Sequence, residues 1–552
     1  MADEQTQSEV QWRELPYMDM TTGEKGIKAV VCGYNMTDTG NAQRLIALCG
    51  QNIRYCVNEK TWYVYEELKT GGGVWAVDEK NKIYALAQDV ISLIHSEVSF
   101  VEADGKKERR EAQKALSKWA FASESLNHIN AMVVLAQSDQ RVTVTSDEFN
   151  ANPWLINCLN GTLDLEAREL RKPAREDLIT KIVAVPYEPE TKSAKWYERL
   201  LEVLSVRQGA FLQRACGSGL TAINRDKALF VLYGKPNARK STLLDAIFKT
   251  LGSYAHPVDI STFAKTITRP GGARPDIVSL EGVRAAQCSE VPHGMIFNDA
   301  FLKAITGANP RSVRDLYEKG AHKVIPVTKF YIETNFLPRI NFDDEAAFNR
   351  FFIVTFLNTI PLEDCDPKIK EFLLDDEEAQ KAIFAWLVQG CYDWQDYGLM
   401  PPDSVNAARQ EYQKTMNPLA SFIEGECILE ADIETATSEL YERFKLAATP
   451  EERHNVSNAQ SFGMYLTKLG FENVHKERGN VRVGIRLRGP TEFDDEVTKR
   501  VTAEDPEDYE ADLLRVPCTI LEYMKKLYKN PSWSSGIQKG FEDDLNEIVD
   551  EI

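Results

Sequence analysis

A chain of 552 residues is longer than one hydrophobic core usually spans, so several domains are expected. Hydrophobic residues make up 43% and charged residues 27%, a globular balance that excludes a largely disordered protein. The formal net charge of −19 argues against a protein that coats nucleic acid. The excess is uneven, because residues 491–552 hold 17 Asp and Glu against 7 Lys and Arg. A narrow basic channel inside an acidic protein remains compatible with this charge.

The sequence offers no sign of a membrane or a secretory route. It has no apolar run long enough for a transmembrane helix, and its acidic start lacks the apolar core of a signal peptide. Ten cysteines are scattered without a CxxC pair, which favours free buried thiols over a zinc site or disulfides. We therefore expect a cytoplasmic protein.

Periodicity and turn signals divide the chain into segments. Gly71-Gly72-Gly73 separates two short strands, and Asn160-Gly161 indicates a β-hairpin. Strand, loop and helix alternate from 228 to 360, which predicts an α/β fold with a parallel sheet. The expected segments are a flexible leader (1–26), an N-terminal α+β domain (27–100), a helical linker or collar domain with the hairpin (101–222), the α/β core (223–375), a helical segment (376–436), a winged-helix-like domain (437–490) and an acidic tail (491–552).

The strongest local signal is a phosphate-binding loop. An apolar strand ending at Tyr233 enters the loop 234–242, which opens a helix. Lys240 is expected to reach the β- and γ-phosphates of ATP, and Ser241 to ligate Mg²⁺. Arg239 stands where the GxxxxGK[ST] pattern has glycine. We expect it to be tolerated, since a residue that initiates a helix can have negative φ. The candidate nucleotide-binding residues are Gly234, Asn237, Ala238, Arg239, Lys240, Ser241 and Thr242.

Three further polar residues complete a candidate catalytic set with Lys240. Glu290 follows a predicted buried strand, where a carboxylate can orient water and help hold Mg²⁺; a surface glutamate is the alternative. Asn335 ends the next strand and is a candidate for contacting the γ-phosphate or the water, or else a turn former. Arg350 precedes another strand and is a candidate arginine finger, or else a surface ion-pair residue.

Two segments are candidate DNA contacts. A basic turn with glycine between apolar runs predicts a hairpin in which Lys319, His322 and Lys323 grip phosphates; a solvated turn is the alternative. The predicted wing is also basic, although such residues on an edge hairpin can simply prevent aggregation. Its basic residues are His475, Lys476, Arg478, Arg482, Arg486 and Arg488.

In this order, the motifs resemble superfamily 3 helicases, in the phage and plasmid primase-helicase branch related to the poxvirus replicative NTPase. The resemblance covers roughly residues 30–490 and includes Phe301–Gly307, Thr334–Pro338 and Asp344 leading to Arg350. It departs at Arg239, at Ala308-Asn309 where glycine-aspartate is common, and at Ser289-Glu290, which supplies one acid where many of these helicases have two.

The resemblance implies a P-loop, AAA+-like ATPase core with helical flanks and a C-terminal winged helix. It also implies a ring, with a hexamer as the expected state. The ring would hydrolyse ATP with Mg²⁺ between subunits and move 3′ to 5′ on single-stranded or forked DNA. The setting would be replication of a mobile element in a bacterial host cytoplasm. No DxD or zinc pattern appears in the first 100 residues, so a separate primase is expected among the replication partners.

Two other functions stay open at the level of sequence. A nucleotide-binding replication initiator or loader with weak hydrolysis is favoured by Arg239. A small-molecule P-loop kinase is disfavoured by the basic hairpin and by the position of Arg350, because a monomeric kinase needs neither.

Overall fold

The computed structural model describes residues 11–18, 25–265, 274–307, 311–313, 322–324, 326–341, 344–357, 367–449, 452, 453, 456, 458–476 and 479–489. The acidic tail lies outside these residues. The chain divides into unit 1, residues 1–189 with 249–254, and unit 2, which holds the rest. Among the described residues, no helix combines the length and apolar character needed to cross a bilayer.

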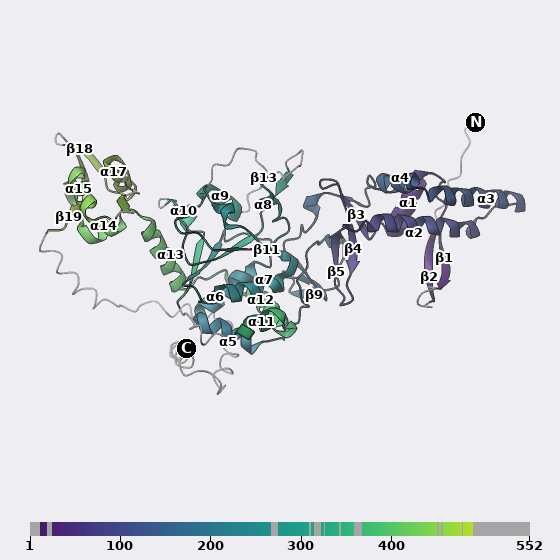
Figure 1. Ribbon diagram of the computed structural model, residues 1–552, viewed down its shortest axis with the longest axis horizontal. Coiled ribbons are helices and arrows are strands. Elements are labelled where there is room, and N and C mark those ends of the chain that lie inside the picture. The colour runs from purple at the N-terminus through teal and green to yellow at the C-terminus, as the bar shows by residue number, and fades with distance from the viewer. Residues whose placement is uncertain are drawn as a thin grey trace. The chain divides into compact units, whose positions relative to one another are not determined.

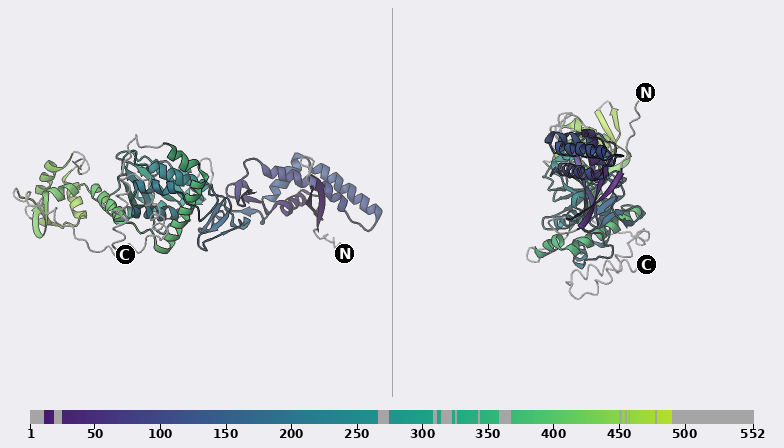
Figure 2. Two further views of the ribbon diagram at one scale, coloured as in Figure 1. Left: turned by 90° about the horizontal axis from the view of Figure 1, so that it is seen from below. Right: turned by 90° about the vertical axis from the view of Figure 1, so that its right-hand side faces the viewer.

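Within its described residues, unit 1 combines small, mainly antiparallel sheets with several helices (Figure 1). Its strands are β1 (Gln11–Met18), β2 (Lys25–Cys32), β3 (Ile53–Cys56), β4 (Thr61–Glu67), β5 (Gly73–Val77), β6 (Thr143–Val144), β7 (Leu155–Cys158), β8 (Gly161–Asp164) and β9 (Glu169–Arg171). Its helices are α1 (Asp38–Cys49), α2 (Lys82–Glu97), α3 (Lys106–Ser123) and α4 (Leu126–Ala136). The hairpin expected at Asn160-Gly161 is formed by β7 and β8. Helices α2 and α3 pack side by side, as their labels in Figure 1 show, and Figure 2 gives two further views of this purple-to-blue part of the chain.

The leader differs from its expected flexibility. Residues 11–18 form β1, which pairs antiparallel with β2 from Gln11↔Cys32 to Met18↔Lys25. Val30 and Val31 of β2 are buried, so the position of this strand pair depends on packing against residues that are distant in sequence. The composition of the leader by itself contains no such signal.

Unit 2 is built on a five-stranded parallel sheet in the order β11-β12-β15-β10-β16. These strands are β10 (Leu229–Gly234), β11 (Ala255–Pro257), β12 (Ala285–Ser289), β15 (Lys329–Thr334) and β16 (Phe351–Phe356), and a separate antiparallel pair is formed by β13 (Arg311–Val313) and β14 (His322–Val324). The α/β class and the parallel sheet expected from the sequence are confirmed.

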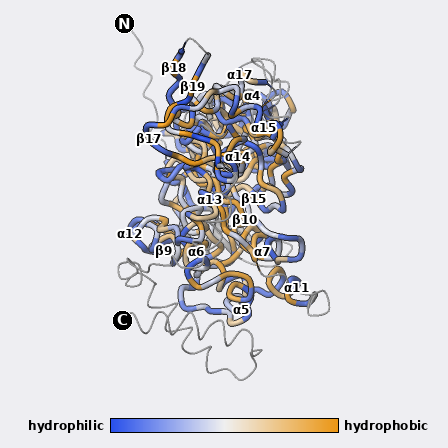
Figure 3. The backbone as a smooth tube through the Cα atoms, turned by 90° about the vertical axis from the view of Figure 1, so that its left-hand side faces the viewer, coloured by the Kyte–Doolittle hydropathy of each residue, from blue (hydrophilic) through white to orange (hydrophobic). Residues whose placement is uncertain are grey.

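The sheet is buried on both faces, so its strands read as apolar runs rather than alternating ones. On one face, Leu229 and Phe330 join a core that includes Phe301 of helix α9 (Asp299–Thr306). On the other face, Phe230 and Tyr331 stack at 5.2 Å between ring centroids. Phe230 also contacts Phe211 of helix α6 (Val206–Ser218), and Tyr331 contacts Phe248 of helix α7 (Lys240–Leu251). In Figure 3 the tube at β10 and β15 is mainly orange, the colour of hydrophobic residues.

The helices of this part of unit 2 are α5 (Ala194–Val203), α6 (Val206–Ser218), α7 (Lys240–Leu251), α8 (Pro275–Val278), α9 (Asp299–Thr306), α10 (Glu345–Phe348), α11 (Pro367–Asp375), α12 (Glu377–Tyr397) and α13 (Asp403–Met416). Helices α6 and α12 pack at backbone distance. A Cβ on Gly217 would lie 2.2 Å from Cys391 N, and one on Gly390 would lie 2.2 Å from Gln213 O. Glycine is therefore required at both positions by close approach.

Residues 420–487 form a smaller substructure with its own core, which includes Phe422, Phe444 and Phe462. Its elements are α14 (Ala420–Glu426), β17 (Cys427–Ala436), α15 (Thr437–Ala447), α17 (Ala459–Lys468), β18 (Asn473–Lys476) and β19 (Gly479–Leu487). The strands form an antiparallel sheet in the order β17-β19-β18. The sequence predicted the helices and the terminal strands, but the segment expected to be helical up to 436 ends in β17.

Candidate functional site

The predicted phosphate-binding loop joins β10 to α7 at the carboxyl edge of the parallel sheet, where α/β proteins bind ligands. Strand β10 lies between β15 and β16, and the loop leaves it at Gly234. A Cβ at Gly234 would lie 2.4 Å from Phe356 O of the neighbouring strand, so only glycine fits there. Helix α7 begins at Lys240, and its free N–H groups face the loop.

Lys240 is the centre of the site. Its Nζ donates hydrogen bonds to Gly234 O at 2.8 Å, to Lys235 O at 2.8 Å and to Asn335 Oδ1 at 2.9 Å. The residue is only 8% exposed. Desolvation lowers the pKa of Lys240, and the carboxylate of Glu333 opposes this shift. The structure thus brings together two residues that the sequence predicted separately, Lys240 and Asn335.

Arg239 takes a backbone conformation that was not expected from the sequence. Its φ is +61°, in the left-handed region, and Asn237 in the same loop has a φ of +64°. The expectation of negative φ at Arg239 is therefore wrong: the backbone has the conformation that favours glycine, although the residue is arginine. Its Nε and Nη2 atoms are buried and have no hydrogen-bond partner among the described residues.

The conformation of Arg239 leads to a stability prediction. We expect Arg239→Gly to have a higher free energy of unfolding than Arg239→Ala, by about 1 kcal/mol, because alanine retains the left-handed strain and glycine does not. Both variants remove the guanidinium, so the comparison isolates the backbone. Urea denaturation of the two variants measures the difference. Equal unfolding free energies would contradict a left-handed conformation at residue 239.

Glu290 and Ser241, the predicted metal ligands, lie at the same edge of the sheet and are both exposed. Glu290 follows β12, has a φ of +58°, and donates its backbone N–H to Glu333 O at 3.1 Å. No hydrogen bond joins Glu290 to Ser241 or Lys240 within the described part of the chain. Their positions suit Mg²⁺ ligands that contact the ion together with phosphate and water. Thr242 is buried one residue further along α7.

Glu333 is a second carboxylate at this edge that the sequence analysis did not select. It pairs with Ser289 in the register of β15 and β12, and its Oε1 accepts a hydrogen bond from Gln287 Nε2 at 3.2 Å. Burial and the nearby Asp245 raise the pKa of Glu333, while Gln287, Lys240 and Lys370 act in the opposite direction. The sequence signal that could have identified Glu333 is an acidic residue directly after the apolar run 330–332 and two residues before Asn335.

Arg350 lies at the opposite edge of the sheet. The parallel register pairs Leu229 with Phe351 and Gly234 with Phe356, so Arg350 is about 20 Å from the loop along the strands. Its Nε donates to Thr306 Oγ1 at 3.0 Å, and its Nη1 to Ala346 O. Arg350 therefore does not meet Lys240, and an arginine-finger role requires the nucleotide site of a neighbouring subunit.

The predicted DNA hairpin corresponds to the pair β13 and β14, in which Val313 pairs with His322. His322 and Lys323 are in β14, whereas Lys319 lies outside the described residues. In the C-terminal substructure, Arg482 is buried. Its Nη2 donates to Gly463 O at 2.7 Å, and its Nη1 donates to Thr467 Oγ1 at 2.7 Å. Its selection as a DNA-contacting residue is wrong, because an arginine that holds helix α17 to the sheet is not available to a ligand.

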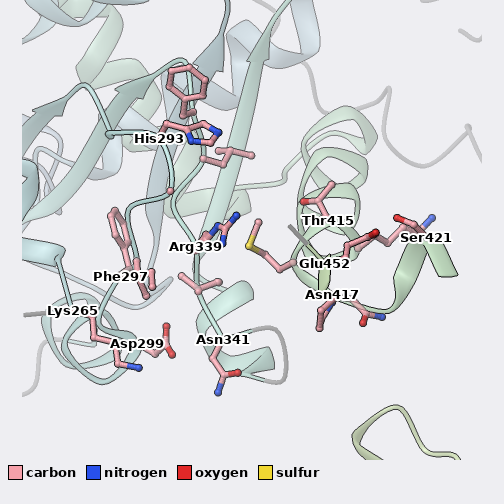
Figure 4. A pocket seen from close by; sticks show the side chains of 18 of the residues that line it. Lys265, His293, Phe297, Asp299, Arg339, Asn341, Thr415, Asn417, Ser421 and Glu452 are labelled. Atoms are coloured by element: carbon pink, nitrogen blue, oxygen red, sulfur yellow. The ribbon is translucent and has the colours of Figure 1, made fainter. Parts of the chain in front are cut away.

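A pocket of about 710 Å³ lies elsewhere in unit 2. Figure 4 shows His293, Arg339 and Asp299 on one side and Thr415 and Asn417 on the other. None of the residues predicted to bind nucleotide or DNA lines this pocket. The edge of the sheet, rather than the pocket, holds the predicted site.

These observations define the class of the protein: an α/β protein with a lysine-centred site at the carboxyl edge of its sheet. Residues 42–205 match the family model described as "D5 N terminal like". The chain is also similar to "Putative helicase L207/L206" of Acanthamoeba polyphaga mimivirus, with 25% identity over 302 residues, 51% of this chain and 31% of that protein. "Putative helicase 121R" of Invertebrate iridescent virus 3 is 25% identical over 50% of this chain and 33% of that protein.

These matches relate part of the chain to the family model described as "D5 N terminal like" and to viral proteins named putative helicases. The chain spans about a third of the length of the curated relatives it matches. Among solved structures, "The A form apo structure of NrS-1 C terminal region-CTR" has a TM-score of 0.39 and 10% identity, over 78% of this chain and 96% of that chain.

Proposed function

We propose that the chain is an ATP-driven helicase motor of superfamily 3 that unwinds DNA during replication of a viral, phage or plasmid genome. The observation that carries the proposal is the hydrogen bond between Lys240 Nζ and Asn335 Oδ1 at the carboxyl edge of the sheet. A lysine after a strand–loop turn and an asparagine at the end of an adjacent strand converge where a γ-phosphate would lie.

The residues present fit ATP and Mg²⁺. Lys240, which donates to two loop carbonyls and Asn335, would exchange these acceptors for phosphate oxygens. Ser241 and Glu290 would hold Mg²⁺, which supplies charge stabilisation for phosphoryl transfer. Asn335 would orient the attacking water or the γ-phosphate. Glu333, half-buried beside Lys240, adds the second acid that Ser289-Glu290 lacks.

The proposed motor also needs to assemble with other subunits and to bind DNA. Arg350 lies away from its own loop, which favours an oligomeric ring, with a hexamer as the proposed state. The hairpin containing His322 and Lys323 would contact single-stranded DNA in the channel, and movement would be 3′ to 5′. The order β17, α15, α17, β18, β19 supports a winged helix. A separate primase and other replication proteins are the proposed partners.

A nucleotide-binding initiator or loader with weak hydrolysis is the second candidate. The strained Arg239 in the loop is the observation that favours it, because a left-handed arginine makes the phosphate cradle costlier to form.

ATP hydrolysis measured with and without single-stranded DNA, beside size-exclusion chromatography and unwinding of a forked substrate, separates the two candidates. The motor proposal expects a ring-sized species, hydrolysis stimulated by single-stranded DNA, and unwinding that needs ATP. Nucleotide binding without turnover in such a species would reject the motor and favour the initiator.

A further inference from the structure

Helix α3 of unit 1 carries a row of cations along one exposed side. Lys106, Arg110, Lys114 and Lys118 follow at intervals of four residues, and Lys107 lies beside them. We call these five residues the basic stripe. Four residues rise about 6 Å along a helix, so the stripe is about 18 Å long. All five residues are exposed.

The basic stripe has no structural use within the described part of the chain. None of its five side chains is in an ion pair there, although the chain has 84 acidic residues. Other basic residues of unit 1 are paired, such as Arg44 with Glu97 at 2.7 Å. Like charges four residues apart repel and weaken a helix. The packing of α3 uses a different side, where Leu116 and Ala120 are buried.

An exposed aromatic ring lies on the same side of the helix. Phe121 follows Lys118 by three residues and Lys114 by seven, which places it in line with the basic stripe. It is 65% exposed. His95 of α2 meets its ring edge-on at 4.8 Å between centroids, and His95 Nε2 is 2.9 Å from Glu124 Oε1. The ring of Phe121 is thereby oriented while most of it stays accessible.

We propose that the basic stripe and Phe121 form a binding surface for single-stranded DNA on unit 1, separate from the predicted channel hairpin. Cations in a row complement a phosphate backbone, and an exposed ring offers a stacking platform for an unpaired base. A duplex keeps its bases stacked inside, and an acidic peptide has no base for Phe121. The inference does not require the nucleotide site to be an ATPase.

The test measures binding of a labelled oligo-dT to the full chain by fluorescence anisotropy, without nucleotide, over a range of salt concentrations. The variant Arg110→Gln/Lys114→Gln/Lys118→Gln is expected to bind about 10- to 100-fold more weakly at 0.1 M salt, with a log–log salt slope smaller by about 2. The matched control is Lys69→Gln/Lys80→Gln/Lys172→Gln, three exposed lysines of unit 1 outside α3, which should retain the affinity.

Phe121→Ala isolates the stacking contact. It should weaken binding about 5-fold or more without changing the salt slope, whereas Val134→Ala, which trims an exposed apolar residue of α4, should not. The proposal is overturned if the two triple variants bind alike. It is also overturned if Phe121→Ala has no effect, or if poly-glutamate displaces the DNA as well as unlabelled oligo-dT does. ATP hydrolysis, measured in the same samples, should survive in all variants; its absence from the parent chain would reject the proposed motor and leave this surface standing.

Discussion

Lys240→Ala is expected to abolish ATP hydrolysis, with a loss of about 10²–10³-fold or more, because the transferred phosphoryl group loses a positioned cation. Lys240 Nζ donates to Asn335 and to two loop carbonyls, and these hydrogen bonds fix the position of the ammonium at the carboxyl edge of the sheet. Steady-state phosphate release measures the effect.

The matched control is Lys249→Ala, which removes an exposed lysine near the other end of α7. It should retain hydrolysis. A Lys240→Ala protein that hydrolyses ATP near the parent rate would eliminate the phosphate-binding loop as the catalytic centre.

Arg350→Ala is expected to lower hydrolysis by about 10³–10⁵-fold while leaving nucleotide binding nearly intact, because an arginine finger acts on the transition state. The distance between Arg350 and its own loop means that this effect must come from a neighbouring subunit. Mixing Arg350→Ala with Lys240→Ala should therefore restore part of the activity, at interfaces that combine an intact loop with an intact arginine. Failure to recover activity in mixtures shown to co-assemble would contradict the trans arrangement.

A structural role of Arg350 needs its own control, since Arg350 Nε donates to Thr306 Oγ1. Thr306→Val removes this acceptor and keeps the guanidinium. If Thr306→Val lowers hydrolysis as much as Arg350→Ala does, the arginine supports the fold of its own subunit and is not a finger.

The local sequence was sufficient to predict those elements whose conformation depends only on their own residues. The apolar strand before Gly234 and the helix after Lys240 could be predicted, as could the Asn160-Gly161 hairpin, since turn chemistry and periodicity act over a few residues. Convergence of Lys240 and Asn335 also followed, because parallel strands present their carboxyl ends at one edge.

The remaining features depend on neighbours that are distant in sequence. Glu333 became part of the site only through the register of β15 with β12. Arg482 looked like a surface cation in the sequence. In the structure it is buried, and its guanidinium donates to Gly463 O in α17 and to Phe471 O, which follows that helix. The left-handed φ of Arg239 opposes its own propensity, so no local rule predicts it.

The short distance along the chain between β14 and β15 has a mechanical consequence. Strand β15 is hydrogen-bonded on both sides, to β12 and β10, and is about 20 Å long, so the sheet holds it straight and stiff. Asn335, bonded to Lys240, follows one end; the other end begins at Lys329, five residues after β14 ends at Val324. In the proposed motor, a change of hydrogen-bond partners at Lys240 would therefore act, through Asn335 and β15, at the start of the connection to the β13–β14 hairpin.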